Sequence, residues 1–184
     1  MKLLTILLVL LVSSVSIFAQ TPAIALSAVP AVKEANPADV SSIEAIMKAV
    51  YDVISGDAGQ KRDWDRFRTL FHKDAKLIPT GKNPQTGITG ARFLTPEDYI
   101  QRAGPSLEKD GFHERELSRK VEQHGTIAHV FSTYVTFRNK NDKDPFMRGI
   151  NSFQLLNDGK RWWVVSIYWL AETPDNPIPA KYLN

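Results

Sequence analysis

The stretch that decides the fold is MRGINSFQLLNDGKRWWVVSIYWL, residues 147–170. Both halves are rich in β-branched and aromatic residues, which favour a pleated, half-buried backbone. Between them lies NDGK at residues 157–160, and an Asp-Gly pair between two such runs is a strong β-hairpin signal. Three of the four tryptophans, Trp162, Trp163 and Trp169, fall in the second half. Because that much aromatic surface requires burial, the hairpin is predicted to form the centre of a curved sheet.

Composition places the chain among ordinary globular proteins. It has 184 residues, 43% of them hydrophobic and 23% charged, which predicts one domain with a substantial core. The net charge is +3 with acids and bases interspersed, and the absence of a basic stripe argues against a nucleic-acid partner. There is no cysteine, which excludes disulfides, thiolate nucleophiles and cysteine-ligated metals. No cofactor is indicated.

The N-terminus has the layout of a secretory signal peptide, predicted over residues 1–19. Lys2 provides a positive charge, residues 3–12 are almost wholly apolar, and cleavage is expected after Ala19. The apolar run is shorter than the about 20 residues that a membrane span needs. The domain is therefore expected to be periplasmic or secreted, with no membrane association after cleavage. An uncleaved N-terminal anchor is the alternative.

The remaining chain divides into three parts. Residues 20–37 are rich in Ala and Pro without periodicity and are predicted to form a linker. The folded domain is expected over residues 38–172. Residues 173–184 form a tail with three prolines, which cannot continue a strand ladder.

Helices are expected first in the domain. Apolar residues recur at helical spacing over residues 40–54, and a shorter helix is predicted over residues 63–71. The sequence TPED at residues 95–98 is a strong helix start, and Gly104-Pro105 is predicted to interrupt or kink that helix. Residues 80–94 lack periodicity and are predicted to form a loop.

Strands follow the helices. Residues 112–123 and 126–138 are predicted strands, and the hairpin of residues 147–170 completes the sheet. Helices followed by antiparallel strands indicate an α+β domain with helices on one face of the sheet.

The order of elements resembles the nuclear transport factor 2-like superfamily, which includes the SnoaL-like polyketide cyclases. The resemblance covers residues 38–172 and rests on patterns of core residues. Its carriers are Asp63-Trp64-x-x-Phe67-x-x-Leu70-Phe71-x-x-Asp74-Ala75, Gly125-x-Ile127-Ala128-x-Val130 and Gly159-x-x-Trp162-Trp163-Val164-Val165.

The resemblance implies a cone-shaped fold, in which a strongly curved antiparallel sheet wraps around the N-terminal helices and leaves a pocket between them. Members of the superfamily include isomerases, dehydratases, cyclases and epoxide hydrolases, and many others have no known activity. Its isomerases pair a tyrosine with a carboxylate in a dry cavity. That motif does not align onto this sequence, so the resemblance carries over no reaction.

Two carboxylates are the first catalytic candidates. Glu114 and Glu116 share a strand face with Phe112, because side chains along a strand alternate in direction. If Phe112 points inward, both carboxylates face the pocket, where burial would separate their pKa values and allow acid–base work. The alternative is a solvated outer face on which both carboxylates form salt bridges.

His129 is the third catalytic candidate. It lies in the middle of a long predicted strand and could act as a general base or lie on the convex face with its hydrogen bonds satisfied. Together with His113 and His124 it lacks any local metal-ligand spacing, so no metal site is predicted.

Six residues are candidates for contact with a ligand. Arg148 could clamp a carboxylate and Asn151 could bind a carbonyl, but the two fall on opposite faces of one strand. Trp64, Tyr99 and Trp169 could form an apolar wall or simply belong to the core. Tyr134 lies on a strand face whose small residues leave room for a ligand or a helix.

Three functions remain open at this point. The favoured one is an exported domain that binds a small apolar or carbonyl-bearing molecule without chemistry and forms a homodimer. The second is a lyase or isomerase that uses Glu114, Glu116 or His129 for proton transfer. The third is a dimeric interaction module, whose sheet face is predicted to hold Ile150, Val165, Ile167 and Trp169.

Overall fold

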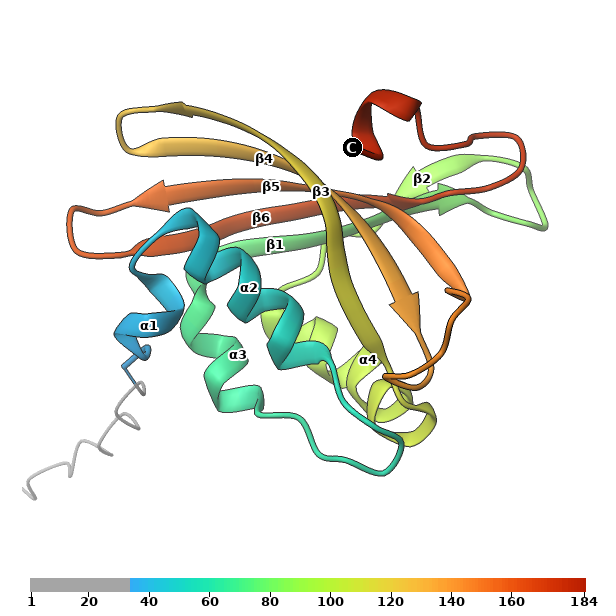
Figure 1. Ribbon diagram of the computed structural model, residues 1–184, viewed down its shortest axis with the longest axis horizontal. Helices are drawn as coiled ribbons and strands as arrows, with labels where there is room; N and C mark the ends of the chain where they lie inside the picture. Colours follow the sequence, from blue (N-terminus) through green and yellow to red (C-terminus); the bar gives the residue numbers. More distant parts are fainter. Residues whose placement is uncertain (1–33) are drawn as a thin grey trace, which may run out of the picture. The chain divides into compact units, whose positions relative to one another are not determined.

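The hairpin of residues 147–170 lies near the centre of a six-stranded sheet in the computed structural model, which describes residues 34–184 (Figure 1). β5 (Met147–Asn157) pairs antiparallel with β6 (Trp162–Ala171). Gly159 in the turn has a φ of 90°, a conformation that only glycine adopts at little cost. The Asp158 carboxylate closes the turn by accepting hydrogen bonds from the backbone of Lys160 and Arg161. The predicted hairpin is thus confirmed, whereas the predicted signal peptide lies outside the described residues.

The other strands are added on both sides of this hairpin. The spatial order is β2-β1-β6-β5-β4-β3, and the sheet is open. The added strands are β1 (Phe71–Lys82), β2 (Thr89–Ala91), β3 (His113–His124) and β4 (Ile127–Phe137). Every neighbouring pair is antiparallel except β1 and β6, which are parallel. The α+β prediction with a strongly curved sheet is confirmed, with this one parallel pair as an addition.

The segment 80–94 contains more structure than a loop. β1 continues to Lys82 and pairs with β2, so the chain forms a short hairpin here. The Asn83 side chain accepts hydrogen bonds from the backbone of Gln85 and Thr86, and Gly87 has a φ of 70°. The prediction of a loop over the whole of residues 80–94 was wrong, because residues 80–82 and 89–91 pair as strands; residues 83–88 between them form the turn.

The helices are α1 (Pro37–Val40), α2 (Ile43–Ile54), α3 (Trp64–Leu70) and α4 (Pro96–Asp110). The Ser42 hydroxyl caps α2 by accepting from the backbone of Ala45, which separates α1 from α2. None of the helices in residues 34–184 is long and apolar enough to cross a membrane.

α4 begins at the predicted residue and runs through the predicted interruption. Thr95 and Asp98 form a reciprocal capping box at its start. Pro105 is on the exposed side, where water can satisfy the carbonyl that loses its partner. Gly104 faces Trp64, whose ring would lie 3.1 Å from an added Cβ. An interruption at Gly104-Pro105 is therefore absent, since α4 is continuous from Pro96 to Asp110, and Gly104 allows the helix to pack closely against α3.

The helices lie on one side of the sheet and the short 3-10 helix η1 (Ala180–Tyr182) lies on the other (Figure 1). The C-terminal tail contains no strand that joins the sheet; it crosses the outer face, where the Thr133 hydroxyl donates to the carbonyl of Tyr182 at 2.6 Å. The core lies between the helices and the inner face. Its most deeply buried members are Ile46, Met47, Phe67, Leu70, Val130, Phe153 and Val164.

A bulge in β6 changes which side chains share a face. Leu155 pairs with Val164 and Gln154 pairs with Ser166, so Val165 is an extra residue without a partner on β5. After the bulge, Ile167 and Trp169 face the helices, whereas Val165 is exposed. The predicted common face of Ile150, Val165, Ile167 and Trp169 was therefore wrong.

Candidate functional site

A cavity of about 230 Å³ lies between the helices and the inner face of the sheet. Its wall is mainly apolar and is formed by α2, α3, α4 and the inner side chains of the strands; representative members are Val50, Phe67, Leu107, Phe112, Phe153 and Ile167. Few of its lining residues carry a polar side-chain group: Glu114, Asn151, Tyr99, Tyr134 and, through its indole N–H, Trp169. An apolar cavity with a few convergent polar groups is the usual form of a small-molecule site.

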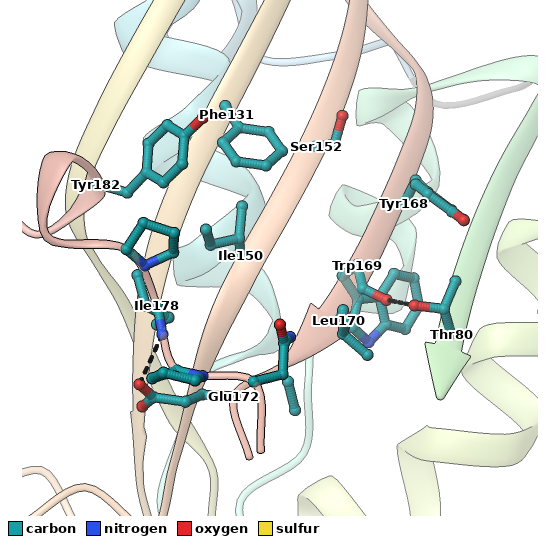
Figure 2. A pocket seen from close by; sticks show the side chains of 14 residues that line it. Thr80, Phe131, Ile150, Ser152, Tyr168, Trp169, Leu170, Glu172, Ile178 and Tyr182 are labelled. Atoms are coloured by element: carbon teal, nitrogen blue, oxygen red, sulfur yellow. Dashed lines mark hydrogen bonds between the residues drawn. The ribbon is translucent and has the colours of Figure 1, made fainter. Parts of the chain in front are cut away.

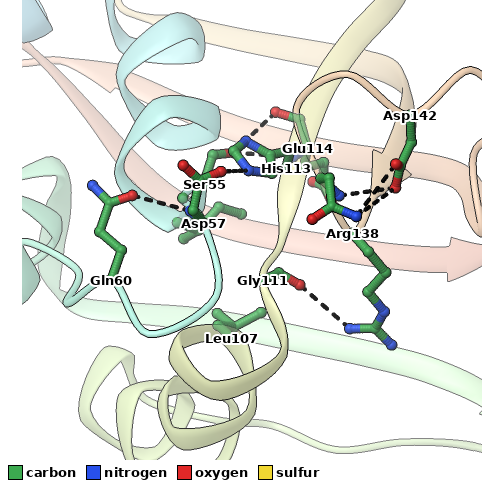
Figure 3. Close-up of polar contacts among 12 residues, drawn as sticks. Ser55, Asp57, Gln60, Leu107, Gly111, His113, Glu114, Arg138 and Asp142 are labelled. Carbon is green, nitrogen blue, oxygen red and sulfur yellow. Dashed lines mark hydrogen bonds and ion pairs between the residues drawn. The ribbon is translucent and has the colours of Figure 1, made fainter.

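The start of β3 is fixed to the end of α2, and this positions Glu114 (Figure 3). The Ser55 hydroxyl lies 3.0 Å from the backbone N of Glu114 and 3.2 Å from its carbonyl oxygen. Gly56, the residue after Ser55, and Phe112, two residues before Glu114, exchange two backbone hydrogen bonds of 2.7 and 3.0 Å. Because both segments are bonded in register, the side chain of Glu114 is directed into the cavity beside Phe112, the arrangement predicted from their alternation.

The hydrogen bonds to the carboxyl of Glu114 are weak. The Thr136 hydroxyl and the Asn151 amide each donate to it at 3.4 Å, which is long for a hydrogen bond. No Lys, Arg or His in residues 34–184 forms an ion pair with it. Burial raises the pKa of Glu114 to about 7, and the two hydrogen bonds oppose that rise. Glu114 lines the cavity, so a carboxyl near half ionisation at neutral pH is part of the wall of an apolar site.

Two tyrosine hydroxyls share the cavity with this carboxyl. Burial, followed by the negative charge of Glu114, raises the pKa of both Tyr99 and Tyr134 well above the ordinary tyrosine value. Both hydroxyls therefore keep their protons at neutral pH and can donate hydrogen bonds. The ring of Tyr99 is fixed between Phe67, with centroids 5.6 Å apart, and Trp169, at 6.4 Å.

A chain of buried hydrogen bonds leads away from Glu114. The Asn151 amide nitrogen is 3.4 Å from Glu114 Oε1 and 3.2 Å from the Tyr51 hydroxyl. Tyr51 is 2.7 Å from the Ser132 hydroxyl, which donates to Glu116 Oε1 at 2.6 Å. The chain joins α2, β3, β4 and β5 behind the cavity wall.

Glu116 ends this chain and does not line the cavity. Arg119 binds its Oε2 through Nε at 2.8 Å and through a terminal nitrogen at 2.6 Å. The predicted pair of pocket carboxylates is thus divided. Glu114 faces the cavity without a cation, whereas Glu116 is held in an ion pair beside it.

The structure places His129 and Arg148 on the outer face of the sheet, away from the cavity. The His129 Nε2 lies 3.1 Å from the Ser152 hydroxyl, and His129 lines a separate pocket with Phe131 and Tyr182. Arg148 forms an ion pair with Glu172, including a hydrogen bond of 3.1 Å from its terminal nitrogen. The opposite orientation of Asn151, which lines the cavity, follows from strand alternation.

Trp64 also lies outside the cavity, whereas Tyr99, Tyr134, Asn151 and Trp169 line it. The Trp64 indole donates to Glu108 at 3.0 Å and covers Gly104. Across residues 34–184 there is no group of three His, Asp or Glu side chains that could hold a metal ion. The cavity thus offers a carboxyl, an amide and two hydroxyls, all suited to an organic ligand.

A second cavity, of about 330 Å³, lies on the outer face between the sheet and the C-terminal tail (Figure 2). Its wall is largely apolar and includes Phe131, Ile150, Leu170 and Tyr182. Its one carboxylate, Glu172, is already bound by Arg148 and by the backbone N of Ile178 at 2.9 Å. The carboxylate of the outer cavity is therefore paired, unlike the Glu114 carboxyl of the inner cavity.

Tyr51, Ser132 and Thr136 were missed as functional candidates from the sequence. Tyr51 lies on an apolar helix face, so the sequence pattern indicates a core residue. Ser132 and Thr136 are indistinguishable in the sequence from other strand residues. The available signal was polar residues on the inward face of β4, at alternate positions with Val130 and Tyr134. Buried hydroxyls require partners, so a polar network could have been expected there.

The sequence matches no protein-family model and no curated protein. Solved structures with the same fold were found. A protein of unknown function from Nostoc punctiforme, described as having a cystatin-like fold, is 12% identical with a TM-score of 0.55; the match covers 77% of this chain and 97% of that chain. LinA is 12% identical with a TM-score of 0.54, and the match covers 76% of this chain and 89% of that chain.

An NTF-2-like protein of unknown function from Silicibacter pomeroyi is 14% identical with a TM-score of 0.50, and the match covers 72% of this chain and 94% of that chain. At these identities the similarity shows the fold alone. The predicted nuclear transport factor 2-like fold is confirmed.

Proposed function

We propose that this domain binds a small, largely apolar carbonyl compound in the inner cavity and moves a proton on it, as an isomerase or lyase does. The observation that carries the proposal is the Glu114 carboxyl, which lies in an apolar cavity without a cation and with a pKa of about 7. A general base is most effective when its pKa is close to the working pH. Such a strongly perturbed carboxyl in a cavity is a candidate for function on physical grounds.

The cavity defines the class of ligand. Its volume of about 230 Å³ is below the roughly 300 Å³ at which typical ligand pockets begin, so a compact molecule is expected. The apolar wall favours a hydrocarbon skeleton. The hydroxyls of Tyr99 and Tyr134, both residues of the cavity wall, keep their protons and can donate hydrogen bonds, which fits a ligand with an acceptor such as a carbonyl oxygen.

The proposed step balances without a cofactor. The Glu114 carboxylate takes a proton from the carbon next to the carbonyl, and the electron pair of that C–H bond forms a carbon–carbon double bond. The carbonyl oxygen becomes an enolate oxygen, which the tyrosine hydroxyls stabilise. Glu114 then returns the proton to the same or another carbon, and return to another carbon gives an isomer.

Deuterium exchange tests this step without knowledge of the product. A panel of small enolisable ketones is incubated with the protein in D₂O, and the loss of the α-proton signals is followed by NMR. We expect exchange to increase with pH through about 7, because the carboxylate form of Glu114 is the base. Glu114→Gln should slow exchange roughly a hundredfold, within the usual contribution of a general base.

The matched control is Glu122→Gln, which makes the same chemical change on the same strand at a side chain that is 86% exposed. The Glu122→Gln variant should exchange the α-protons of the ketones at the wild-type rate. If the ketones bind but the wild-type protein exchanges no α-protons, the domain is a binding protein without chemistry, and the proton-transfer proposal fails.

We also propose that the domain acts outside the cytoplasm, as a periplasmic or secreted protein. The support is Lys2, the apolar residues 3–12 and the Ala19-Gln20 junction. Mass spectrometry of the protein purified from its native host should find a mature N-terminus near Gln20. Recovery of the chain with Met1 intact in the soluble fraction would contradict export. The homodimer expected from the sequence stays a prediction.

A further inference from the structure

Glu116 lies outside the cavity, yet it is connected to Glu114 by a continuous chain of buried side chains. We infer that Glu116 is a positioning residue, whose ion pair sets the direction of the hydrogen-bond chain that ends on Glu114. This inference rests on the proposed function in one respect, that Glu114 is the proton-transfer group. The direction of the chain follows from counting protons along it.

The chain starts at a group that can only accept. Arg119 Nε donates to Glu116 Oε2 at 2.8 Å, and a terminal nitrogen of Arg119 lies 2.6 Å from the same oxygen, so Glu116 is the anionic partner of an ion pair. The Ser132 oxygen lies 2.6 Å from the other oxygen of that carboxylate. Because an ionised carboxylate has no proton to give, the single hydroxyl proton of Ser132 must point to Glu116.

This assignment fixes the next two bonds. Ser132 has used its proton, so it accepts the proton of Tyr51 across 2.7 Å. The Tyr51 oxygen can then only accept, and the side-chain atom of Asn151 that lies 3.2 Å away must be the amide nitrogen. Ser132, Tyr51 and Asn151 are 0%, 5% and 6% exposed, so water has little access to reverse these bonds.

The last bond reaches the proposed proton carrier. The same amide nitrogen lies 3.4 Å from Glu114 Oε1, so Asn151 presents an N–H group to Glu114. Donation of an N–H favours the ionised form of a carboxyl, which opposes the effect of burial. A reversed chain would present the Asn151 oxygen instead, and that oxygen can bond only to the protonated form of Glu114.

The other ionisable groups around Glu114 do not compete in this pH range. They are Tyr51 on α2, Tyr99 on α4 and Tyr134 on β4, and burial raises the pKa of all three above the ordinary tyrosine value. All three stay neutral when Glu114 titrates. A change in its titration midpoint after substitution at Glu116 therefore reports on the direction of the chain or on the charge at position 116.

Glu116→Gln separates these two causes. A glutamine can donate to Ser132 and so permits the reversed chain, which should raise the titration midpoint of Glu114 by about one pH unit. Loss of the negative charge at position 116 acts in the opposite direction and lowers the midpoint. The midpoint is measured by ¹³C NMR of the carboxyl carbons in the intact protein without ligand, with the Glu114 signal identified by its absence in Glu114→Gln.

Ser132→Ala provides a second route to the same result. It removes the acceptor of the Tyr51 proton and leaves the charge of Glu116 in place, so Tyr51 can donate to the Asn151 oxygen. The Glu114 midpoint should again increase, whereas Glu122→Gln should leave it unchanged. A purely structural role for Glu116 would lower the melting temperature without raising this midpoint.

The inference is overturned if the Glu114 midpoint stays constant or falls in both folded variants. If Glu116→Gln does not fold, Ser132→Ala alone decides. The readout requires no turnover, so it is independent of the deuterium-exchange experiment. A raised midpoint together with no exchange in the wild-type protein would support the positioning role and reject the proposed function.

Discussion

Glu114→Gln should raise the free energy of unfolding by about 3 kcal/mol at pH 8 and leave it nearly unchanged at pH 4. The cause is the cost of an ionised carboxyl in an apolar cavity. The ordinary pKa of a glutamate is 4.5, and burial raises the pKa of Glu114 to about 7 in the folded protein. The difference between these two pKa values corresponds to about 3 kcal/mol of folding free energy.

The sign of the pH dependence follows from the folded and unfolded states. Below pH 4.5 the group is protonated in both states, and it costs nothing. Between pH 4.5 and about 7 the unfolded state ionises first, so the wild-type protein loses stability as the pH rises. Above about pH 7 the free-energy cost of burying Glu114 no longer increases, because the carboxyl is ionised in both states. Glutamine keeps the shape of the side chain but cannot ionise, so the variant should lack this part of the pH dependence.

Urea unfolding of both proteins at several pH values between 4 and 8 measures this effect. The difference in unfolding free energy should grow over that range and level off above the pKa of Glu114. Glu122→Gln, at an exposed position of the same strand, should show a difference near zero throughout. A constant difference between wild type and Glu114→Gln across the range would show that Glu114 titrates as a solvated carboxyl.

The orientation of Glu114 could be predicted because side chains alternate in direction over a short strand segment, which is a local property of the chain. Phe112 is an apolar marker two residues away, and no bulge separates it from Glu114. The different state of Glu116 could not be predicted in the same way. The ion pair of Glu116 with Arg119 and its hydrogen bond with Ser132 decide that state, and Ser132 lies on a different strand, β4.

The faces of β6 illustrate the second limit of sequence reasoning. A one-residue bulge moves every later side chain to the opposite face, so alternation counted through Val165 gives the wrong result for Ile167 and Trp169. The bulge is a feature of the register between β6 and β5, and it has no strong local signal in the sequence. In contrast, the hairpin turn and the start of α4 were predicted correctly, because an Asp-Gly pair and a Thr-Pro cap act through local chemistry.

The two tryptophans that precede the bulge give the second large prediction. Trp162 and Trp163 are adjacent on β6 and point to opposite faces. Trp162 is 5% exposed and belongs to the core. Trp163 lies on the outer face, where the Arg161 guanidinium stacks 3.6 Å from the ring centroid and the indole donates to Asp158 at 2.8 Å.

Trp162→Ala should therefore lower the free energy of unfolding by about 3–5 kcal/mol, because it removes a large buried side chain and leaves a cavity in the core. Trp163→Ala removes a surface stacking contact and one hydrogen bond, so its cost should be about 1 kcal/mol. Urea denaturation of the two single variants at one pH compares them directly. The two changes delete the same atoms from neighbouring residues, so the difference between them compares the loss of a buried ring with the loss of the surface contacts of Trp163. Equal losses in both variants would mean that the hairpin does not present Trp162 to the core, and the position of the sheet over the inner cavity would then be wrong as well.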